Sequence, residues 1–198
     1  MSQDNKNEEK KLSWQQSVVL YFHDLAYLLA FIMVLFLLVF RIVVVDGTSM
    51  NRTLLHGDYV LLLSNVFYPQ PENGDIIVLS KNAYDDGAPI VKRVIATEGQ
   101  TVDINFETGA VYVDGVELDE PYINTRTNTT GGTQFPLVVD EGCIFVMGDN
   151  RNKSKDSRYP EIGIIDEREV LGKAIFLVFP GTNRGEYQAD FSRIGAIS

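Results

Sequence analysis

The chain has 198 residues, with 27 acidic residues against 17 Lys and Arg, which gives a formal net charge of −10 at pH 7. This acidic balance argues against a nucleic-acid partner, because binding to phosphates requires a basic face. One cysteine excludes an internal disulfide, and one cysteine with two scattered histidines gives no ligand spacing for a metal site.

The first apolar element runs from Leu25 to Val45 and is interrupted only by Arg41. A helix rises about 1.5 Å per residue, so about 20 residues cross the ~30 Å hydrocarbon core of a bilayer. We therefore expect a transmembrane anchor over residues 25–45, with the Arg41 guanidinium reaching to an interface. A cleaved signal peptide would have a shorter apolar region that ends in small residues, which residues 43–46 do not provide. The charges on either side are too balanced to set the orientation.

Residues 46–198 show patterns typical of strands and turns rather than of helices. Short apolar or alternating runs bounded by turn residues predict strands at residues 59–63, 76–79, 90–96 and 174–179. Asp114-Gly115 suits a type I′ turn, so residues 111–118 should form a hairpin. We predict one mostly β domain over residues 46–198, with an insertion at about residues 97–141.

Ser49 lies four residues after the apolar run, in the sequence Asp46-Gly47-Thr48-Ser49-Met50. A serine hydroxyl becomes a nucleophile when a neighbouring base removes its proton. His56 is close in sequence and is one candidate base, whereas His23 falls at the membrane segment. A nucleophile so near to an anchor would act on substrates that emerge from the same membrane.

Lys92 is the other candidate base. Successive side chains of a strand point to opposite faces, so Lys92 should share a face with Ile90, Val94 and Ala96. Burial among aliphatic side chains lowers the pKa of a lysine from about 10.4, and the neutral amine can then accept a proton from a serine. The alternative is that Lys92 reaches solvent from the edge of a sheet.

A polar segment at residues 148–158 follows an apolar run that begins at Cys143, which we expect to pack as a small buried hydrophobe. The ordinary interpretation of this segment is a loop rich in Asn and Asp. In a functional interpretation, its charged residues form a salt-bridged scaffold near the lysine. These residues are Asp149, Arg151, Asp156 and Arg158.

Together these segments resemble the type I signal peptidases, the Ser-Lys leader peptidases of bacterial membranes. Four boxes occur in the order of that family, at residues 47–54, 57–60, 91–95 and 148–158. The resemblance implies a signal-peptidase-like β fold on the outer face of the cell membrane, with residues 1–24 as a cytoplasmic tail. It implies removal of signal peptides from exported preproteins, after small residues at −1 and −3. It implies no cofactor, and we expect a monomer whose partners are preproteins and the lipid bilayer.

The resemblance also assigns roles to residues. Ser49 Oγ attacks the scissile carbonyl to form an acyl-enzyme, and Lys92 is the general base. Ser154 matches the position whose hydroxyl bonds the lysine amine. The backbone N–H of Ser49 is the expected oxyanion donor, since Gly47 stands where some members carry a hydroxyl residue. Positions that support the site structurally match Arg93, Asp149, Arg151, Asp156 and Arg158.

Two departures from the family pattern support a rival interpretation. Asn51-Arg52 occupies the positions where the nucleophile box usually has x-Pro, and residues 96–99 differ from the usual Gly-Leu-Pro-Gly. The rival is a catalytically impaired signal-peptidase-like membrane protein that acts as a binding or assembly factor. The presence of Ser49, Lys92 and Ser154 weighs against it. A second rival, the related self-cleaving Ser-Lys repressors, carries a DNA-binding segment where this chain has an anchor.

Overall fold

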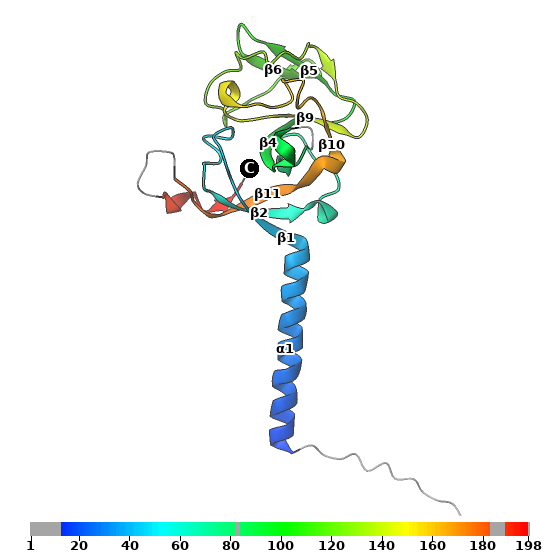
Figure 1. Ribbon diagram of the computed structural model, residues 1–198, viewed down its shortest axis with the longest axis vertical. Helices are drawn as coiled ribbons and strands as arrows, with labels where there is room; N and C mark the ends of the chain where they lie inside the picture. The colour runs from blue at the N-terminus through cyan, green and yellow to red at the C-terminus, as the bar shows by residue number, and fades with distance from the viewer. Residues whose placement is uncertain (1–12, 82–83, 183–188, 198) are drawn as a thin grey trace, which may run out of the picture. The chain divides into compact units, whose positions relative to one another are not determined.

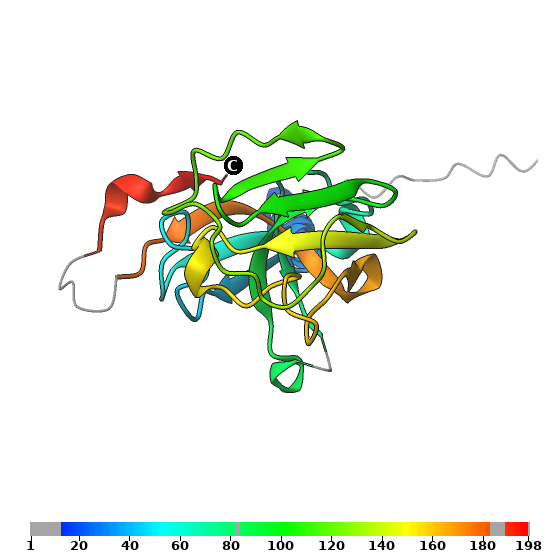
Figure 2. The same cartoon turned by 90° about the horizontal axis from the view of Figure 1, so that it is seen from above.

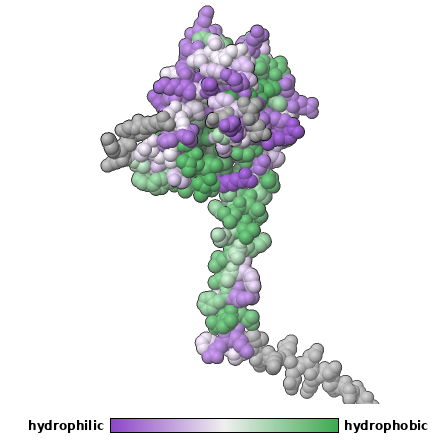
Figure 3. Space-filling view, viewed as in Figure 1, coloured by the Kyte–Doolittle hydropathy of each residue, from purple (hydrophilic) through white to green (hydrophobic). Residues whose placement is uncertain are grey.

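A computed structural model describes residues 13–81, 84–182 and 189–197, which belong to two compact units, Met1–Leu38 and Val39–Ser198. In the first unit the described residues form one helix, α1, which spans Trp14–Val39 and buries none of its side chains within the protein (Figure 1). Figure 3 shows apolar side chains along most of its length. Within the described part of the chain, α1 is the one helix long and apolar enough to cross a membrane.

The helix begins and ends earlier than the sequence predicts. It includes residues 14–24, which we expected in the cytoplasmic tail, and it ends at Val39. The last part of the expected span, Phe40–Val44, is instead strand β1 of the β domain. Its run of Ile and Val residues explains the change, because β-branched side chains lose little rotamer freedom in a strand and pack well on a pleated surface.

The β domain contains a large antiparallel sheet with the strand order β1-β2-β11-β3-β4-β9-β10, and β12 pairs with the far end of β11. The long strand β11 lies between β2 and β3: its residues 170–173 pair with β3 and its residues 172–179 pair with β2. Gly172 lies where the two pairings overlap, and a Cβ there would stand 2.2 Å from the Leu63 carbonyl oxygen. The strands after β1 are β2 Tyr59–Ser64, β3 Ile76–Leu79, β4 Ile90–Ala96, β9 Cys143–Met147, β10 Ile165–Asp166, β11 Val170–Phe179 and β12 Gly195–Ala196.

A smaller sheet with the order β7-β6-β5-β8 occupies the stretch expected as an insertion. Figures 1 and 2 show it lying over the end of the large sheet that contains β4 and β9. The predicted hairpin is present as β6 and β7, and both turn residues have positive φ, 51° at Asp114 and 78° at Gly115, as a type I′ turn requires. The strands of the smaller sheet are β5 Thr101–Asn105, β6 Ala110–Val113, β7 Val116–Glu117 and β8 Leu137–Val138.

Short 3₁₀ turns connect several strands. They are η1 Asn65–Phe67, η2 Asp85–Gly87, η3 Arg151–Lys153, η4 Glu167–Glu169 and η5 Phe191–Arg193.

Two parts of the core hold the site in place. One cluster joins the sheets, because Ile95 and Phe145 of the large sheet pack with Val102 and Val111 of the small one. Cys143 is only partly buried and packs against this cluster. A second cluster lies under the segment between β1 and β2 and includes the side chains of Met50 and Leu54.

Candidate active site

Ser49 lies on the loop that joins β1 to β2, which we call the nucleophile loop (residues 46–57). The β1–β2 ladder continues to the base of this loop, where the Val45 N–H donates to the Asp58 carbonyl and the Gly57 N–H donates to the Val45 carbonyl, at 2.9 and 2.8 Å. Met50 and Leu54 are each 1% exposed and insert into the core. Burial of an apolar side chain of this size contributes about 1.5–3 kcal/mol. The loop that carries Ser49 is therefore anchored at its base and in its middle.

Strand β4 brings Lys92 to Ser49. The Lys92 amine lies 3.0 Å from Ser49 Oγ and donates a hydrogen bond to the Val91 carbonyl at 2.9 Å. β4 lies between β3 and β9 in the sheet, and Lys92 is 3% exposed, so the side chain does not reach solvent from an edge.

Burial changes the acid–base properties of this amine. It lowers the pKa of Lys92 from 10.5 to about 8, against a smaller opposing effect of the negative charges of Asp156 and Asp149. At pH 7, one unit below this pKa, about a tenth of the amine is neutral. A neutral amine at 3.0 Å can accept the proton of the Ser49 hydroxyl.

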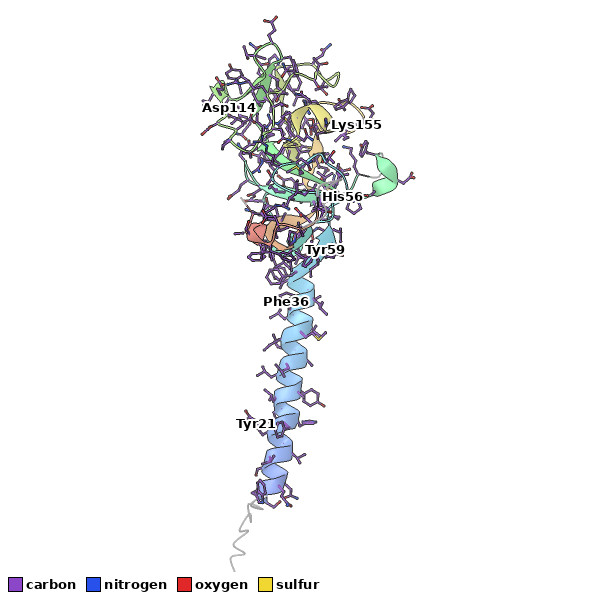
Figure 4. All side chains as sticks on the ribbon, turned by 90° about the vertical axis from the view of Figure 1, so that its left-hand side faces the viewer. Tyr21, Phe36, His56, Tyr59, Asp114 and Lys155 are labelled. Carbon is purple, nitrogen blue, oxygen red and sulfur yellow. The ribbon has the colours of Figure 1, made fainter. Side chains whose placement is uncertain are left out.

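His56, labelled in Figure 4, contacts the start of the nucleophile loop instead of Ser49. Its Nδ1 lies 3.3 Å from the Gly47 N–H and 3.1 Å from Asp46 Oδ1. One nitrogen cannot accept from the first and donate to the second at once, so Nδ1 accepts from Gly47 when it carries no proton and donates to Asp46 when it carries one. Of the two candidate bases, only Lys92 has a hydrogen bond to Ser49 among the described residues.

The segment after β9 packs directly against the nucleophile loop. The Asn150 N–H donates to the Ser49 carbonyl, and its side-chain amide donates to the Thr48 carbonyl, both at 2.9 Å. Gly148 has no room for a side chain, because a Cβ there would lie 2.5 Å from the Ser49 carbonyl oxygen and 2.3 Å from Ser154 Oγ. Asn150 lies within the last sequence box, but sequence reasoning gave it no role.

Arg93 and Asp149 form a buried pair beside the dyad. The guanidinium bonds both carboxylate oxygens at 2.9 Å, and Thr53 Oγ1 of the nucleophile loop donates to the same carboxylate at 2.5 Å. The ring of Tyr122 covers the guanidinium, with the Arg93 Cζ 3.9 Å from its centroid. The pair therefore links β4, the nucleophile loop and the insertion.

Asp156 and Arg158 form a second buried pair. Arg158 bonds both oxygens of Asp156, at 2.8 and 2.9 Å, and donates to the Arg151 carbonyl at 2.5 Å. The Gly148 N–H donates to the Asp156 carboxylate at 3.0 Å. This pair fixes the turn that carries Asn150 and Gly148.

Arg151 pairs with the insertion. It is fully buried, bonds the Glu120 carboxylate with two nitrogens, and reaches Thr127 Oγ1 at 3.0 Å. Glu120 lies 31 residues from Arg151 in the sequence, and no local pattern indicates the pairing. Glu120, Tyr122 and Thr53, like Asn150, are contact residues to which sequence analysis assigned no role.

Ser154 lies at the site in a different arrangement from the one expected. Its side chain is buried, and its Oγ lies against Gly148. Within the described residues its hydroxyl donates one hydrogen bond, to the Lys155 carbonyl at 3.4 Å, and none connects it to the Lys92 amine. The Val91 carbonyl supplies the bond that orients Lys92.

A groove of about 560 Å³ opens beside the nucleophile loop. The end of β1, the start of the nucleophile loop and the start of β4 form its walls. Apart from the Asp46 carboxylate its side chains are apolar, and it reaches Gly47, two residues before Ser49. The lining residues are Val43, Val44, Asp46, Gly47, Ala88, Pro89 and Ile90.

Comparison with known proteins places this chain in a family. The model of the signal peptidases, peptidase S26, matches residues 18–179. A probable signal peptidase I-1 of Synechocystis sp. is 40% identical over 151 residues, 72% of each chain. Signal peptidase I of Bacillus licheniformis is 33% identical over 188 residues, 89% of this chain and 95% of the relative. A crystal structure of a signal peptidase I from Enterococcus faecalis matches 52% of this chain and 96% of its own, with 32% identity and a TM-score of 0.43.

The family match spans β1 to β11 and therefore includes Ser49, Lys92 and the charged pairs that surround them. The two relatives named above each exceed 30% identity over most of both chains. The chain therefore belongs to the signal peptidase family, peptidase S26, and is a serine peptidase of that family.

Proposed function

We propose that Ser49 and Lys92 are the catalytic dyad with which this chain removes signal peptides from exported preproteins. The observation that carries the proposal is the buried Lys92 amine 3.0 Å from Ser49 Oγ. A nucleophile within hydrogen-bond reach of a base, with the base oriented by a third group, is the arrangement that acyl transfer requires. The third group here is the Val91 carbonyl.

The proton moves as follows. Neutral Lys92 accepts the hydroxyl proton as Ser49 Oγ adds to the scissile carbonyl, and the resulting ammonium gives that proton to the leaving amine. The signal peptide then remains as an ester on Ser49. Lys92, neutral again, accepts a proton from the water that hydrolyses the ester and returns it to Ser49 Oγ.

The backbone N–H of Ser49 is the proposed oxyanion donor. Within the described residues, this N–H donates no hydrogen bond. The bonds from Asn150 to the carbonyls of Ser49 and Thr48 hold this stretch of backbone in a fixed orientation. A donor that is already oriented stabilises the developing negative charge without reorganisation.

The groove beside the nucleophile loop is the proposed substrate site. β1 is an edge strand of the large sheet, so an extended peptide can add there by main-chain hydrogen bonds. Alternate side chains of such a peptide point to the same side, which fits two positions, −1 and −3, that face the groove together. The apolar walls and the proximity of Gly47 fit small side chains at these positions.

We propose α1 as a single-pass membrane anchor, with the N-terminus cytoplasmic and the β domain outside. The anchor and a signal peptide then share one bilayer, which raises their effective concentration without any new contact at the scissile bond. Both dyad residues come from one chain, which fits a monomeric enzyme.

Cleavage of a preprotein with Ala-x-Ala before its cut site tests the function. We would compare detergent-solubilised wild type, Ser49→Ala and Lys92→Ala, and sequence the N-terminus of the product. Lys155→Ala is the matched control, because Lys155 is exposed and its side chain lies outside the dyad. We expect cutting after the last alanine by wild type and control alone. A folded wild type that cuts no such substrate would favour a binding or assembly factor.

A further inference from the structure

The end of the chain forms an additional contact with the nucleophile loop. The family match ends at residue 179, and the segment in question, which we call the C-terminal clasp, is residues 190–197. Its strand β12 pairs with β11 through Ala196 and Gly195, and the Ile197 N–H donates to the Ile175 carbonyl at 3.1 Å. Figure 1 shows this red segment running beside β11.

Arg193 is the residue through which the clasp contacts the loop. Its guanidinium bonds both oxygens of Asp58, at 2.9 and 2.6 Å, and also donates to the Thr53 carbonyl at 3.3 Å. Asp58 is fully buried and accepts two further bonds, from the N–H groups of Leu55 and Gly181, both at 2.7 Å. A planar guanidinium can bond two carboxylate oxygens and a carbonyl together, whereas an ammonium supplies one point charge.

Both partners of Arg193 belong to the hydrogen-bond network around the loop that carries Ser49. Asp58 closes the base of the nucleophile loop, because its carbonyl accepts from Val45. Thr53 is bonded through its hydroxyl to Asp149, which Arg93 holds in turn next to Lys92. Arg193 therefore contacts the nucleophile loop at Thr53 and the residue that closes its base, Asp58.

We propose that Arg193 is a positioning residue for the reaction: by bridging Asp58 and Thr53, it holds the nucleophile loop so that Ser49 stays within reach of Lys92. The inference rests on the proposed function of these two residues. Loss of the guanidinium leaves a buried carboxylate without its counter-charge and frees the Thr53 carbonyl, so the loop relaxes. Ser49 then spends less time at the attacking distance, which lowers kcat more than substrate affinity.

The test is the kinetics of Arg193→Gln on the Ala-x-Ala preprotein, well below the melting temperature of each variant. Arg168→Gln is the matched control, because the Arg168 guanidinium also bonds both carboxylate oxygens of an aspartate, Asp166, but does so on the surface. We expect kcat of Arg193→Gln to fall about 10- to 100-fold with KM nearly unchanged, and the control to match wild type. Wild-type kcat in folded Arg193→Gln would overturn the proposal.

A rescue measurement separates positioning from general stabilisation. Arg193 borders a cavity of about 240 Å³ between the loop and the clasp, so free guanidinium can enter Arg193→Ala. We expect non-denaturing guanidinium chloride, but not sodium chloride, to restore part of kcat. A loss of activity that follows only the unfolded fraction and does not respond to guanidinium would contradict positioning.

If the uncharged variants do not fold, Arg193→Lys replaces them. This variant keeps a positive charge next to Asp58 but loses the planar guanidinium that bonds Asp58 and Thr53 together. We therefore expect reduced kcat and faster hydrogen exchange in residues 46–57. Full kcat with unchanged exchange would overturn the proposal. If wild type and Arg168→Gln are also inactive, the proposed function fails, whereas active controls with unaffected Arg193 variants refute this inference alone.

Discussion

Lys92 and Arg93 are adjacent cations on the same strand, both almost fully buried, yet their surroundings differ. Arg93 has a carboxylate, Asp149, bonded to both prongs of its guanidinium. The hydrogen-bond partners of the Lys92 amine in the described structure are a hydroxyl and a carbonyl, both uncharged. Arg93 is buried together with a counter-charge, whereas burial without a bonded counter-charge lowers the pKa of Lys92 to about 8. One strand therefore carries a charge-paired guanidinium beside a buried amine of lowered pKa, as the proposed role of Lys92 requires.

The nearby carboxylates strengthen this contrast. Asp149 and Asp156 would favour a protonated Lys92, but each is bonded to an arginine, Arg93 or Arg158. Each arginine satisfies the carboxylate that could otherwise bond the amine. The supporting charges therefore matter for the acid–base chemistry as well as for the fold.

Lys92→Arg should make positions 92 and 93 alike, both with a permanent charge, and we expect it to lower activity most. A guanidinium stays protonated at every accessible pH and cannot accept the Ser49 proton. We expect kcat to fall by at least about 10³-fold, within the range assigned to general base catalysis. Single-turnover cleavage by the purified variant measures this, and circular dichroism checks the fold. Activity near the wild-type level would exclude Lys92 as the base.

Asp149→Asn should leave Arg93 as a buried charge without a partner. Breaking a buried pair in this way costs about 3–5 kcal/mol of the free energy of unfolding. Chemical denaturation of the β domain measures the change. Asp166→Asn is the control, since its pair with Arg168 lies on the surface, and we expect it to leave stability unchanged. Equal effects of the two substitutions would show that burial does not distinguish the pairs.

Lys92→Met should stabilise the protein while abolishing cleavage. Because the pKa of Lys92 is 10.5 when exposed and about 8 when folded, the unfolded chain binds more protons between these values, so stability rises with pH there. Below pH 8 the wild type carries the full cost, about 3 kcal/mol, which methionine avoids. We therefore expect the gain in unfolding free energy at pH 7 to shrink above pH 10. A gain that is the same at both pH values would contradict the linkage.

A smaller effect of Asp149→Asn concerns Lys92 itself. The Asp149 charge raises the pKa of Lys92, so its removal should lower that pKa and move the acid limb of activity to lower pH. The pH dependence of kcat in the folded variant measures the shift. A shift of the acid limb to higher pH would contradict the conclusion that the Asp149 charge raises the pKa of Lys92.

Local patterns in the sequence predicted much of this arrangement. Asp114-Gly115 predicted a hairpin that the structure contains, because two positive φ angles restrict the choice of residues. Alternation in residues 90–96 placed Lys92 among apolar neighbours, and the structure buries it. The order of the four boxes indicated the family, which the comparisons show.

Other features depend on contacts that no local pattern specifies. The end of the helix at Val39 was missed because apolar and β-branched residues suit a membrane helix and a β-strand equally well. Glu120 meets Arg151 from 31 residues away, and Arg193 meets Asp58 from 135 residues away. Such pairs become visible only when the topology brings the strands together.

The acid limb of the pH dependence of kcat tests the central claim most directly. It would be measured for wild type under single turnover from pH 5 to 10, with the Ala-x-Ala preprotein at saturation. If Lys92 is the base, kcat should rise with pH through a midpoint of about 8, where the amine loses its proton. A midpoint below about 5, in the range of carboxyl groups, or a rate independent of pH, would contradict a lysine base.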